Sequence, residues 1–353
     1  MTKIALITDL HLGYKENTIQ SKYMYEYLQW FFEDLKNKNI SQIFILGDIF
    51  DNRENINFLT IKNTIQNLID PIMEGGFKAY VAAGNHDCFY KNTNDIYSVE
   101  LLFSRMNNFD KHFILAKNEC KNIIIDNVSI LLTPWINSQN YDCVMNEIKD
   151  SNADYLMGHF EINGFTMVKG IKCSNGIKQD IFNKFKKVFS GHFHLRESKG
   201  NITYIGTPYE KDWNDHCSPK GYTILDLENG DTEFIVNKNN YFITIEYKEN
   251  TAIDEKYLEN KEIKLIINSV NKQSDLDQFL NDVYRSNPSK LQIIDNTSMI
   301  KDQSDKTEKT DYQNNDNIEI FKNYVDKLTL DETIDKNEIK NILISAYNES
   351  LVK

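Results

Sequence analysis

The chain has 353 residues, of which 41% are hydrophobic and 12% aromatic, so it is long enough for about two domains and lacks the composition of a disordered protein. Its formal net charge is -12, and no segment is a basic tail of the kind that binds nucleic acid electrostatically. This argues against tight binding of DNA or RNA without metal ions, although divalent cations or a basic partner would reverse the local field.

The cysteines predict neither a disulfide framework nor a zinc knuckle, because they are odd in number, widely spread and free of C-x-x-C spacing. They are Cys88, Cys120, Cys143, Cys173 and Cys217. The chain starts without a signal-peptide core, and no apolar stretch reaches the roughly 18 residues of a membrane-spanning helix. We therefore expect a soluble protein of the reducing cytoplasm that makes no membrane contact.

In the first quarter of the chain, short apolar runs end in turns that carry polar side chains. These are 4–7 before Asp9-Leu10-His11-Leu12-Gly13, 43–46 before Gly47-Asp48-Ile49-Phe50-Asp51, and 79–83 before Gly84-Asn85-His86-Asp87. The runs are too short for helices and predict strands. Residues 18–38 and residues near 57–69, which precede Pro71, predict helices between them. Strand alternating with helix favours a parallel or mixed sheet covered on both faces.

Two later strands end in histidines. Residues 113–132 are rich in short β-like runs; 155–157 then precede Gly158-His159, and 187–190 precede Gly191-His192-Phe193-His194. Five of the seven histidines thus lie in turns at strand ends, and we interpret the other two, His112 and His216, as surface residues.

The last third of the chain contains no such motif. Residues 241–300 predict a small appended α+β unit with three strands and one helix, for which Ser274 and Asp277 resemble a capping box. Residues 301–317 are almost wholly polar and predict a flexible linker. Residues 318–353 predict a short helix pair, which is too small to form a core alone. We expect it to pack on another chain, with docking onto its own catalytic domain as the alternative.

The turns together supply oxygen and nitrogen donors from five strand ends. The donors are Asp9, His11, Asp48, Asn85, His159, His192 and His194. One cation cannot use seven donors, but two cations about 3.5 to 4 Å apart can if a carboxylate bridges them, and such a pair clamps a phosphoryl group and generates hydroxide at neutral pH. The pattern predicts a dinuclear hydrolase, and donors without thiolate suit manganese, iron or zinc.

The motif order D-x-H, G-D-x-x-D, G-N-H-D, G-H and G-H-x-H resembles the calcineurin-like metallophosphoesterase superfamily over residues 1 to about 210. Within it, the chain resembles the SbcD-type DNA repair nucleases, including those of T-even-type phages, whose motifs match Gly47–Asp51 and Ile205–Pro208. This resemblance implies an α/β (α+β) fold: a β-sandwich flanked by helices in 1–240, a capping domain in 241–300 and the helix pair.

The resemblance also implies a role for each site residue. Asp9, His11 and His194 would bind one metal ion, Asn85, His159 and His192 the other, and Asp48 would bridge the two. His86 would protonate the leaving oxygen as the catalytic acid. The Asp51 carboxylate would orient His86, with a helix cap as its alternative role, while Asp87 is expected to be structural.

The implied function is that of a manganese-dependent nuclease acting on DNA ends and single strands in recombination, repair and replication. Its partner would be an SbcC-like SMC-family ATPase bound through 318–353. A homodimer would form through helices near 57–69 and 94–106, with the alternative that the apolar stripes of both helices face the protomer's own core. A chain of phage origin would work in the host cytoplasm. Two alternatives remain: a scaffold that only tethers DNA ends for the ATPase, and a protein phosphatase.

Overall fold

A computed structural model describes residues 2–216, 218–248, 251, 253–297, 336–337 and 339–340. Met1–Asp295 forms one compact unit and Asn296–Lys353 a second. The expected linker 301–317 lies outside the described residues, and so does the expected helix pair 318–353 apart from 336–337 and 339–340. No helix among the described residues has both the length and the apolar character needed to cross a membrane.

Within the described residues, six strands form a sheet in the order β14-β13-β1-β2-β3-β4. They are β1 (Lys3–Ile7), β2 (Gln42–Ile45), β3 (Lys78–Ala82), β4 (Phe113–Ala116), β13 (Gly221–Asp226) and β14 (Thr232–Val236). β1 to β4 are parallel, whereas β13 pairs antiparallel with β1 and β14. In β1, Ile4 and Leu6 pack in one apolar cluster, and Ala5 and Ile7 in another. The strand is an unbroken apolar run because both of its faces are covered.

A second sheet has the order β11-β12-β10-β7-β6-β5. Its strands are β5 (Lys121–Ile125), β6 (Val128–Thr133), β7 (Tyr155–His159), β10 (Lys187–Gly191), β11 (Glu197–Lys199) and β12 (Ile202–Tyr204). Phe44 and Leu6 of the first sheet share a buried cluster with Met157 and Phe189 of the second. The two sheets therefore pack face to face, and the predicted β-sandwich is confirmed.

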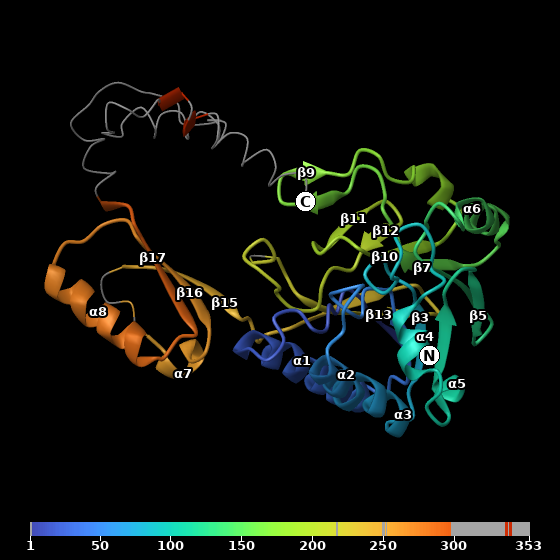
Figure 1. Ribbon diagram of the computed structural model, residues 1–353, viewed down its shortest axis with the longest axis horizontal. Helices are drawn as coiled ribbons and strands as arrows, with labels where there is room; N and C mark the ends of the chain where they lie inside the picture. Colours follow the sequence, from blue (N-terminus) through green and yellow to red (C-terminus); the bar gives the residue numbers. More distant parts are fainter. Residues whose placement is uncertain are drawn as a thin grey trace. The chain divides into compact units, whose positions relative to one another are not determined.

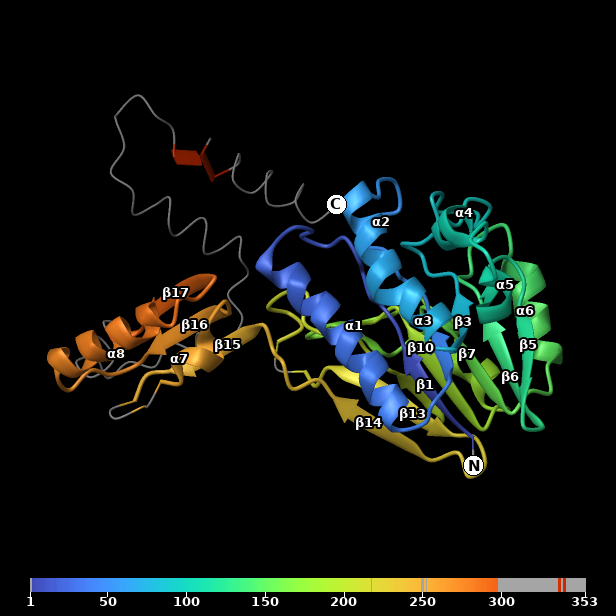
Figure 2. The same cartoon turned by 90° about the horizontal axis from the view of Figure 1, so that it is seen from below.

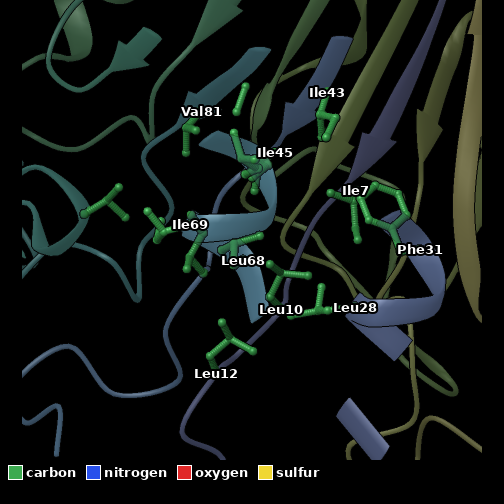
Figure 3. Close-up of a cluster of buried hydrophobic side chains, with 14 of the residues drawn as sticks. Ile7, Leu10, Leu12, Leu28, Phe31, Ile43, Ile45, Leu68, Ile69 and Val81 are labelled. Atoms are coloured by element: carbon green, nitrogen blue, oxygen red, sulfur yellow. The ribbon is translucent and has the colours of Figure 1, made fainter. Parts of the chain in front are cut away.

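Helices cover the other face of the first sheet (Figure 2). They are α1 (Ile19–Asn37), α2 (Phe58–Thr64), the π-helical turn η1 (Ile65–Ile69) and α3 (Asp70–Glu74), with α4 (Ser98–Phe103) and α5 (Phe109–His112) farther along the chain. Figure 3 shows Leu28 and Phe31 of α1 in one apolar cluster with Ile7, Ile43 and Ile45 of the first sheet. Thr18 caps α1 through a capping box.

The helix expected to end before Pro71 continues past it. Pro71 lies in the first turn of α3, directly after η1. The π-helical turn accommodates it: the Asp70 N–H bonds to the Ile65 carbonyl, five residues back, and this shift in the hydrogen-bond pattern lies directly before the residue that lacks an N–H. Helical structure thus covers the expected residues near 57–69 and extends beyond them to Glu74.

The outer face of the second sheet is covered by α6 (Tyr141–Asp150) and the 3-10 turn η2 (Gln179–Phe182). Val144 and Ile148 of α6 and Phe182 of η2 are buried against Leu156 and Val188 of the sheet. A hairpin of β8 (Thr166–Val168) and β9 (Ile171–Lys172) lies between β7 and β10 in the chain. The sandwich is thus flanked by helices on both sides, as predicted.

A small parallel sheet follows the sandwich, with α8 along one face (Figure 1). Its elements are β15 (Phe242–Glu246), α7 (Glu255–Leu258), β16 (Glu262–Ile267), α8 (Gln273–Arg285) and β17 (Lys290–Asp295). The expected capping box is wrong, because α8 starts after Lys272 and has no side-chain cap. The division of Met1–Asp295 at residue 240 remains a prediction.

Candidate metal centre

The predicted donors come together at one edge of the sandwich. Asp9, Asp48 and Asn85 follow β1, β2 and β3, while His159 ends β7 and His192 follows β10. β1 to β3 are parallel in one sheet, and β7 and β10 are parallel in the other. Parallel strands bring their carboxyl ends to the same edge, where open α/β folds bind ligands.

Several of these turns are strained. The φ angles are 53° at Asp9, 44° at His11, 53° at Asp48 and 91° at His192. Positive φ is uncommon for residues other than glycine, and such strain gathers at functional sites, where the surrounding structure imposes it. The fold therefore holds these four donors in conformations that the chain would not adopt alone.

Two glycines allow the turns to approach one another. Gly47 has a φ of 93°, and a Cβ atom there would lie 2.5 Å from His159 Nδ1. A Cβ atom on Gly84 would lie 2.2 Å from Asp48 Oδ1. The G-D and G-N-H patterns thus have a steric reason, since any side chain would displace a donor.

Three groups among the described residues have donor atoms close enough to hold a metal ion. They are Asp9 with His11 and His194, Asp48 with His159 and His192, and His11 with Asp48 and His86. Asp48 Oδ2 lies 3.9 Å from His11 Nε2 and 3.4 Å from His159 Nε2. One carboxylate oxygen therefore faces a histidine nitrogen in each of the first two groups.

The first group has the geometry of ligands that share an ion. His11 Nε2 and His194 Nε2 lie 3.1 Å apart. Two nitrogens bound to one ion at about 2.0 to 2.1 Å lie roughly 3 Å from each other. Burial lowers the pKa of His11 to about 4, which keeps its ring neutral and able to bind a cation. His11 Nδ1 faces Asp51 Oδ1 at 3.3 Å, the arrangement that orients metal-bound histidines.

The second group converges on Asn85. Its Oδ1 atom lies 3.0 Å from His159 Nε2 and 2.9 Å from His192 Nδ1. His159 Nδ1 lies 2.7 Å from the Leu46 carbonyl, so a proton on Nδ1 leaves Nε2 as the ligand atom. Burial lowers the pKa of His192 to about 3. Burial also acts to lower the pKa of His159, but the Asp48 and Asp9 carboxylates outweigh it and raise that pKa to about 9.

His86 is held beside both groups, but not by the expected partner. Its Nδ1 atom lies 2.6 Å from the main-chain carbonyl of Asp51, and its N–H donates to Asp48 Oδ1 at 2.8 Å. The Asp51 carboxylate instead accepts a hydrogen bond from Lys211 Nζ at 2.9 Å. The expected contact between the Asp51 carboxylate and His86 was therefore wrong, because Lys211 and His11 hold that carboxylate.

Asp87 has the structural role expected of it. Its carboxylate accepts hydrogen bonds from the main-chain N–H groups of Ile49, Phe50 and Gly84. These bonds fasten the turn after β2 to the turn after β3.

Comparison with known proteins places this site in a family. The calcineurin-like phosphoesterase model matches residues 2–196, which include all the donor motifs. The chain belongs to the calcineurin-like phosphoesterase family. This confirms the superfamily predicted from the motif order.

The phosphoesterase is also similar to individual proteins. It is 32% identical over 274 residues to a protein of Enterobacteria phage T4 described as exonuclease subunit 1. The match covers 76% of this chain and 78% of that protein. Two solved structures also match. A novel archaeal phosphodiesterase has 14% identity and a TM-score of 0.37, with 67% of this chain and 100% of that one covered. A dimetal phosphatase from Danio rerio has 10% identity and a TM-score of 0.40, with 65% and 93% covered.

Sequence reasoning missed several residues beside the phosphoesterase site. Lys211 pairs with Asp51, Asp215 Oδ1 lies 3.7 Å from His194 Nδ1, and Lys220 Nζ lies 3.1 Å from the same Asp215 oxygen. None of them belongs to a strand-end motif, and the nearest sequence signal is the Ile205–Pro208 stretch just before them. Trp135 packs against the ring of His192, with centroids 5.1 Å apart.

Neither of the remaining histidines is a fully exposed surface residue. His112 Nδ1 lies 2.9 Å from the Phe77 carbonyl. His216 lies between Glu210 and Thr244, 2.9 Å and 3.0 Å away. The surface interpretation was wrong for His216, whose side chain is only 16% exposed.

The donor set of this phosphoesterase fits divalent metal ions. Histidine, carboxylate and amide donors are present without thiolate, and carboxylate or carbonyl oxygens face the outer nitrogens of His11 and His159. When bound, such ions polarise a phosphoryl oxygen and supply a nucleophile at neutral pH. The protein's own contribution is to hold the donors and to present His86.

Proposed function

We propose that this phosphoesterase is a DNA nuclease subunit that hydrolyses phosphodiester bonds at DNA ends and in single strands, with two divalent metal ions, most favourably manganese. The observation that carries the proposal is the position of Asp48 Oδ2 between two groups of donors. Similarity to a phage protein described as exonuclease subunit 1 supports DNA as the substrate.

The proposed ligand sets follow the observed groups. Asp9, His11 and His194 bind one ion, and Asp48 binds both. Asn85, His159 and His192 complete the second set, in line with the 2.9 to 3.0 Å distances around Asn85 Oδ1.

His86 is the proposed catalytic acid. The Asp51 carbonyl faces Nδ1 at 2.6 Å and accepts the proton on that atom. When the ring is doubly protonated, Nε2 carries the second proton and gives it to the leaving oxygen, which leaves a neutral imidazole protonated on Nδ1. The half-buried position of His86 leaves it accessible to a substrate. Asp51 thus has two roles: its main-chain carbonyl positions His86, and its carboxylate positions His11.

The test uses purified full-length protein and end-labelled DNA, single-stranded and duplex. Cleavage should require Mn²⁺, stop when a chelator is added, and be absent from the Asp48→Asn variant. A phosphate monoester serves as the control substrate for the protein phosphatase alternative. Faster hydrolysis of that monoester, without cleavage of DNA, would contradict the nuclease. DNA binding without any metal-dependent cleavage would instead favour the tethering scaffold.

The proposal includes a partner. A protein named as a subunit works with at least one other chain, and we propose an SbcC-like ATPase bound through residues 318–353. A chain ending at Ile300 should keep manganese-dependent cleavage of single strands and lose co-purification with the ATPase. Unchanged ATPase affinity of the shortened chain would show that docking lies elsewhere, for example on the proposed capping domain 241–300.

We also propose a homodimer, through exposed apolar side chains of the helices near 57–69 and 94–106. Val99 and Phe103 of α4 are buried in the protomer's own core, so they are unable to form the interface. Phe58 at the start of α2 is 91% exposed and Leu101 of α4 is 70% exposed. Exposed apolar residues of this size support an interface with a second copy.

A further inference from the structure

The segment Tyr209–His216, here named the connecting loop, contacts the candidate metal centre with some of its residues and the small sheet with others. It follows the Ile205–Pro208 stretch and precedes β13. The ligand and acid roles proposed above do not include it.

Two residues of the connecting loop support the first group of donors. Lys211 Nζ donates to Asp51 Oδ1 at 2.9 Å, and the same oxygen faces His11 Nδ1 at 3.3 Å. Asp215 Oδ1 faces His194 Nδ1 at 3.7 Å. His11 and His194 are the pair whose Nε2 atoms lie 3.1 Å apart. The outer nitrogen of each ring therefore faces a carboxylate that belongs to the loop or is held by it.

This side of the loop is firmly anchored. Asp215 is nearly fully buried, and its carboxylate accepts hydrogen bonds from Lys220 Nζ at 3.1 Å and from the Lys211 main-chain N–H at 3.0 Å. The hydroxyl of Tyr209 donates to the carbonyl of Leu10, the residue between Asp9 and His11. A shift of the loop would consequently move the supports of the first donor group.

Trp213 contacts the small sheet. Its Nε1–H donates to Glu262 Oε1 at 2.9 Å, and its ring packs on Phe242 with centroids 4.9 Å apart. Lys264 Nζ lies 4.0 Å from the centre of the same ring, at the distance of a cation–π contact. Glu262 and Lys264 are on the face of β16 that alternates with the α8-facing residues Ile263 and Leu265.

The two ends of the loop are fastened to β15. Glu210 Oε2 accepts hydrogen bonds from the main-chain N–H groups of Tyr241 and Phe242, at 3.1 Å and 3.0 Å. His216 bridges Glu210 Oε1 and Thr244 Oγ1. Residues 210, 213 and 216 thus hold the small sheet, whereas residues 211 and 215 support the donors.

We propose that the connecting loop is a positioning element through which the small sheet holds His11 and His194 in the geometry that binds one of the two metal ions. The inference rests on the two-metal function proposed above. Carboxylates behind a histidine fix its orientation and raise its basicity, and their loss lowers metal affinity by about 10 to 100-fold. Asn85, His159 and His192 have no contact of this kind with the loop among the described residues, so their ion should be unaffected.

The test is Mn²⁺ binding to the full-length Trp213→Ala variant, measured by calorimetry and by electron paramagnetic resonance. One ion should bind more weakly, by up to the roughly 10 to 100-fold that loss of the supporting carboxylates would cost, and the other as in the wild type. At stoichiometric metal the coupled dinuclear signal should give way to that of isolated Mn²⁺. Tyr284→Ala is the matched control, because Tyr284 is an exposed aromatic residue on α8; it should leave both ions unchanged.

The outcomes separate this inference from the proposed function. A folded Trp213→Ala protein that binds both ions as tightly as the wild type overturns the inference, and so does an equal loss of both ions. A wild-type protein that binds fewer than two ions overturns the proposed function instead. If Trp213→Ala does not fold, Trp213→Phe keeps an aromatic ring without the N–H donor. It should weaken the same ion by a smaller factor, and unchanged binding would again overturn the inference.

Discussion

The first sheet of the sandwich and the small sheet are both built on parallel strands, yet their central strands differ. β1 is apolar at Ile4, Ala5, Leu6 and Ile7, because the second sheet covers one face and helices the other. β16 alternates: Ile263 and Leu265 pack against α8, whereas Glu262 and Lys264 contact Trp213. The first sheet, which is covered on both faces, places metal donors at its edge. The small sheet, which packs against α8 on one face only, keeps a polar face that contacts the connecting loop, and this loop supports those donors.

The largest expected effect concerns the catalytic step, which is tested separately from the packing of either sheet. His86→Ala should slow DNA cleavage by roughly a hundred- to ten-thousand-fold, because a positioned proton donor is lost while the proposed ligands stay in place. Cleavage rates and metal content are measured on the same preparation. A variant that loses its metal ions, or that cleaves at the wild-type rate, would show that His86 is not the acid.

The next prediction tests the packing of the first sheet against the second. Phe44 is fully buried between the two sheets and stacks on Tyr80, with centroids 4.6 Å apart. Phe44→Ala should lower the free energy of unfolding by about 3 to 5 kcal/mol, from lost burial and the cavity that remains. Urea unfolding followed by circular dichroism measures this, and a loss well below 1 kcal/mol would contradict the sandwich packing.

The small sheet predicts unequal effects at neighbouring positions of β16. Leu265→Ala faces α8 and should cost about 2 to 5 kcal/mol of unfolding free energy. Lys264→Ala loses a cation–π contact with Trp213 and should cost about 0.5 to 1 kcal/mol. The same unfolding experiment compares the two. Equal losses would mean that the two faces of the small sheet do not differ as described.

The last expected effect concerns association and not folding. Phe58→Ser should weaken the proposed dimer about tenfold or more, since a large exposed apolar side chain is lost from the interface. Light scattering across micromolar concentrations measures it, with Tyr141→Ser, an exposed aromatic of α6, as the control. A wild-type protein that stays at the monomer mass of 41.3 kDa would rule out the dimer.

Sequence patterns were informative where a contact is encoded locally. The strand-end turns identified Asp9, Asp48 and His159, because parallel strands must bring such turns to one edge. The helix expected over residues 18–38 is likewise present as α1 (Ile19–Asn37), with Leu28 and Phe31 buried on one face.

The features that the sequence patterns did not predict depend on contacts between residues distant in the chain. Lys211 pairs with Asp51, which lies 160 positions earlier in the chain, and no local spacing in the sequence predicts that pair. The family resemblance had implied that the Asp51 carboxylate orients His86. His216 was read as a surface residue, because Glu210 and Thr244 bury it only once the small sheet is in place.

The central claim is that Asp48 serves two metal ions, and metal stoichiometry tests it most directly. Asp48→Asn keeps the size of the side chain but removes the charge that would neutralise both cations. Elemental analysis and anomalous scattering should find two Mn²⁺ ions in the wild-type protein and neither at full occupancy in the variant. One ion retained at full occupancy in Asp48→Asn would contradict the account, because it would show that Asp48 does not bridge.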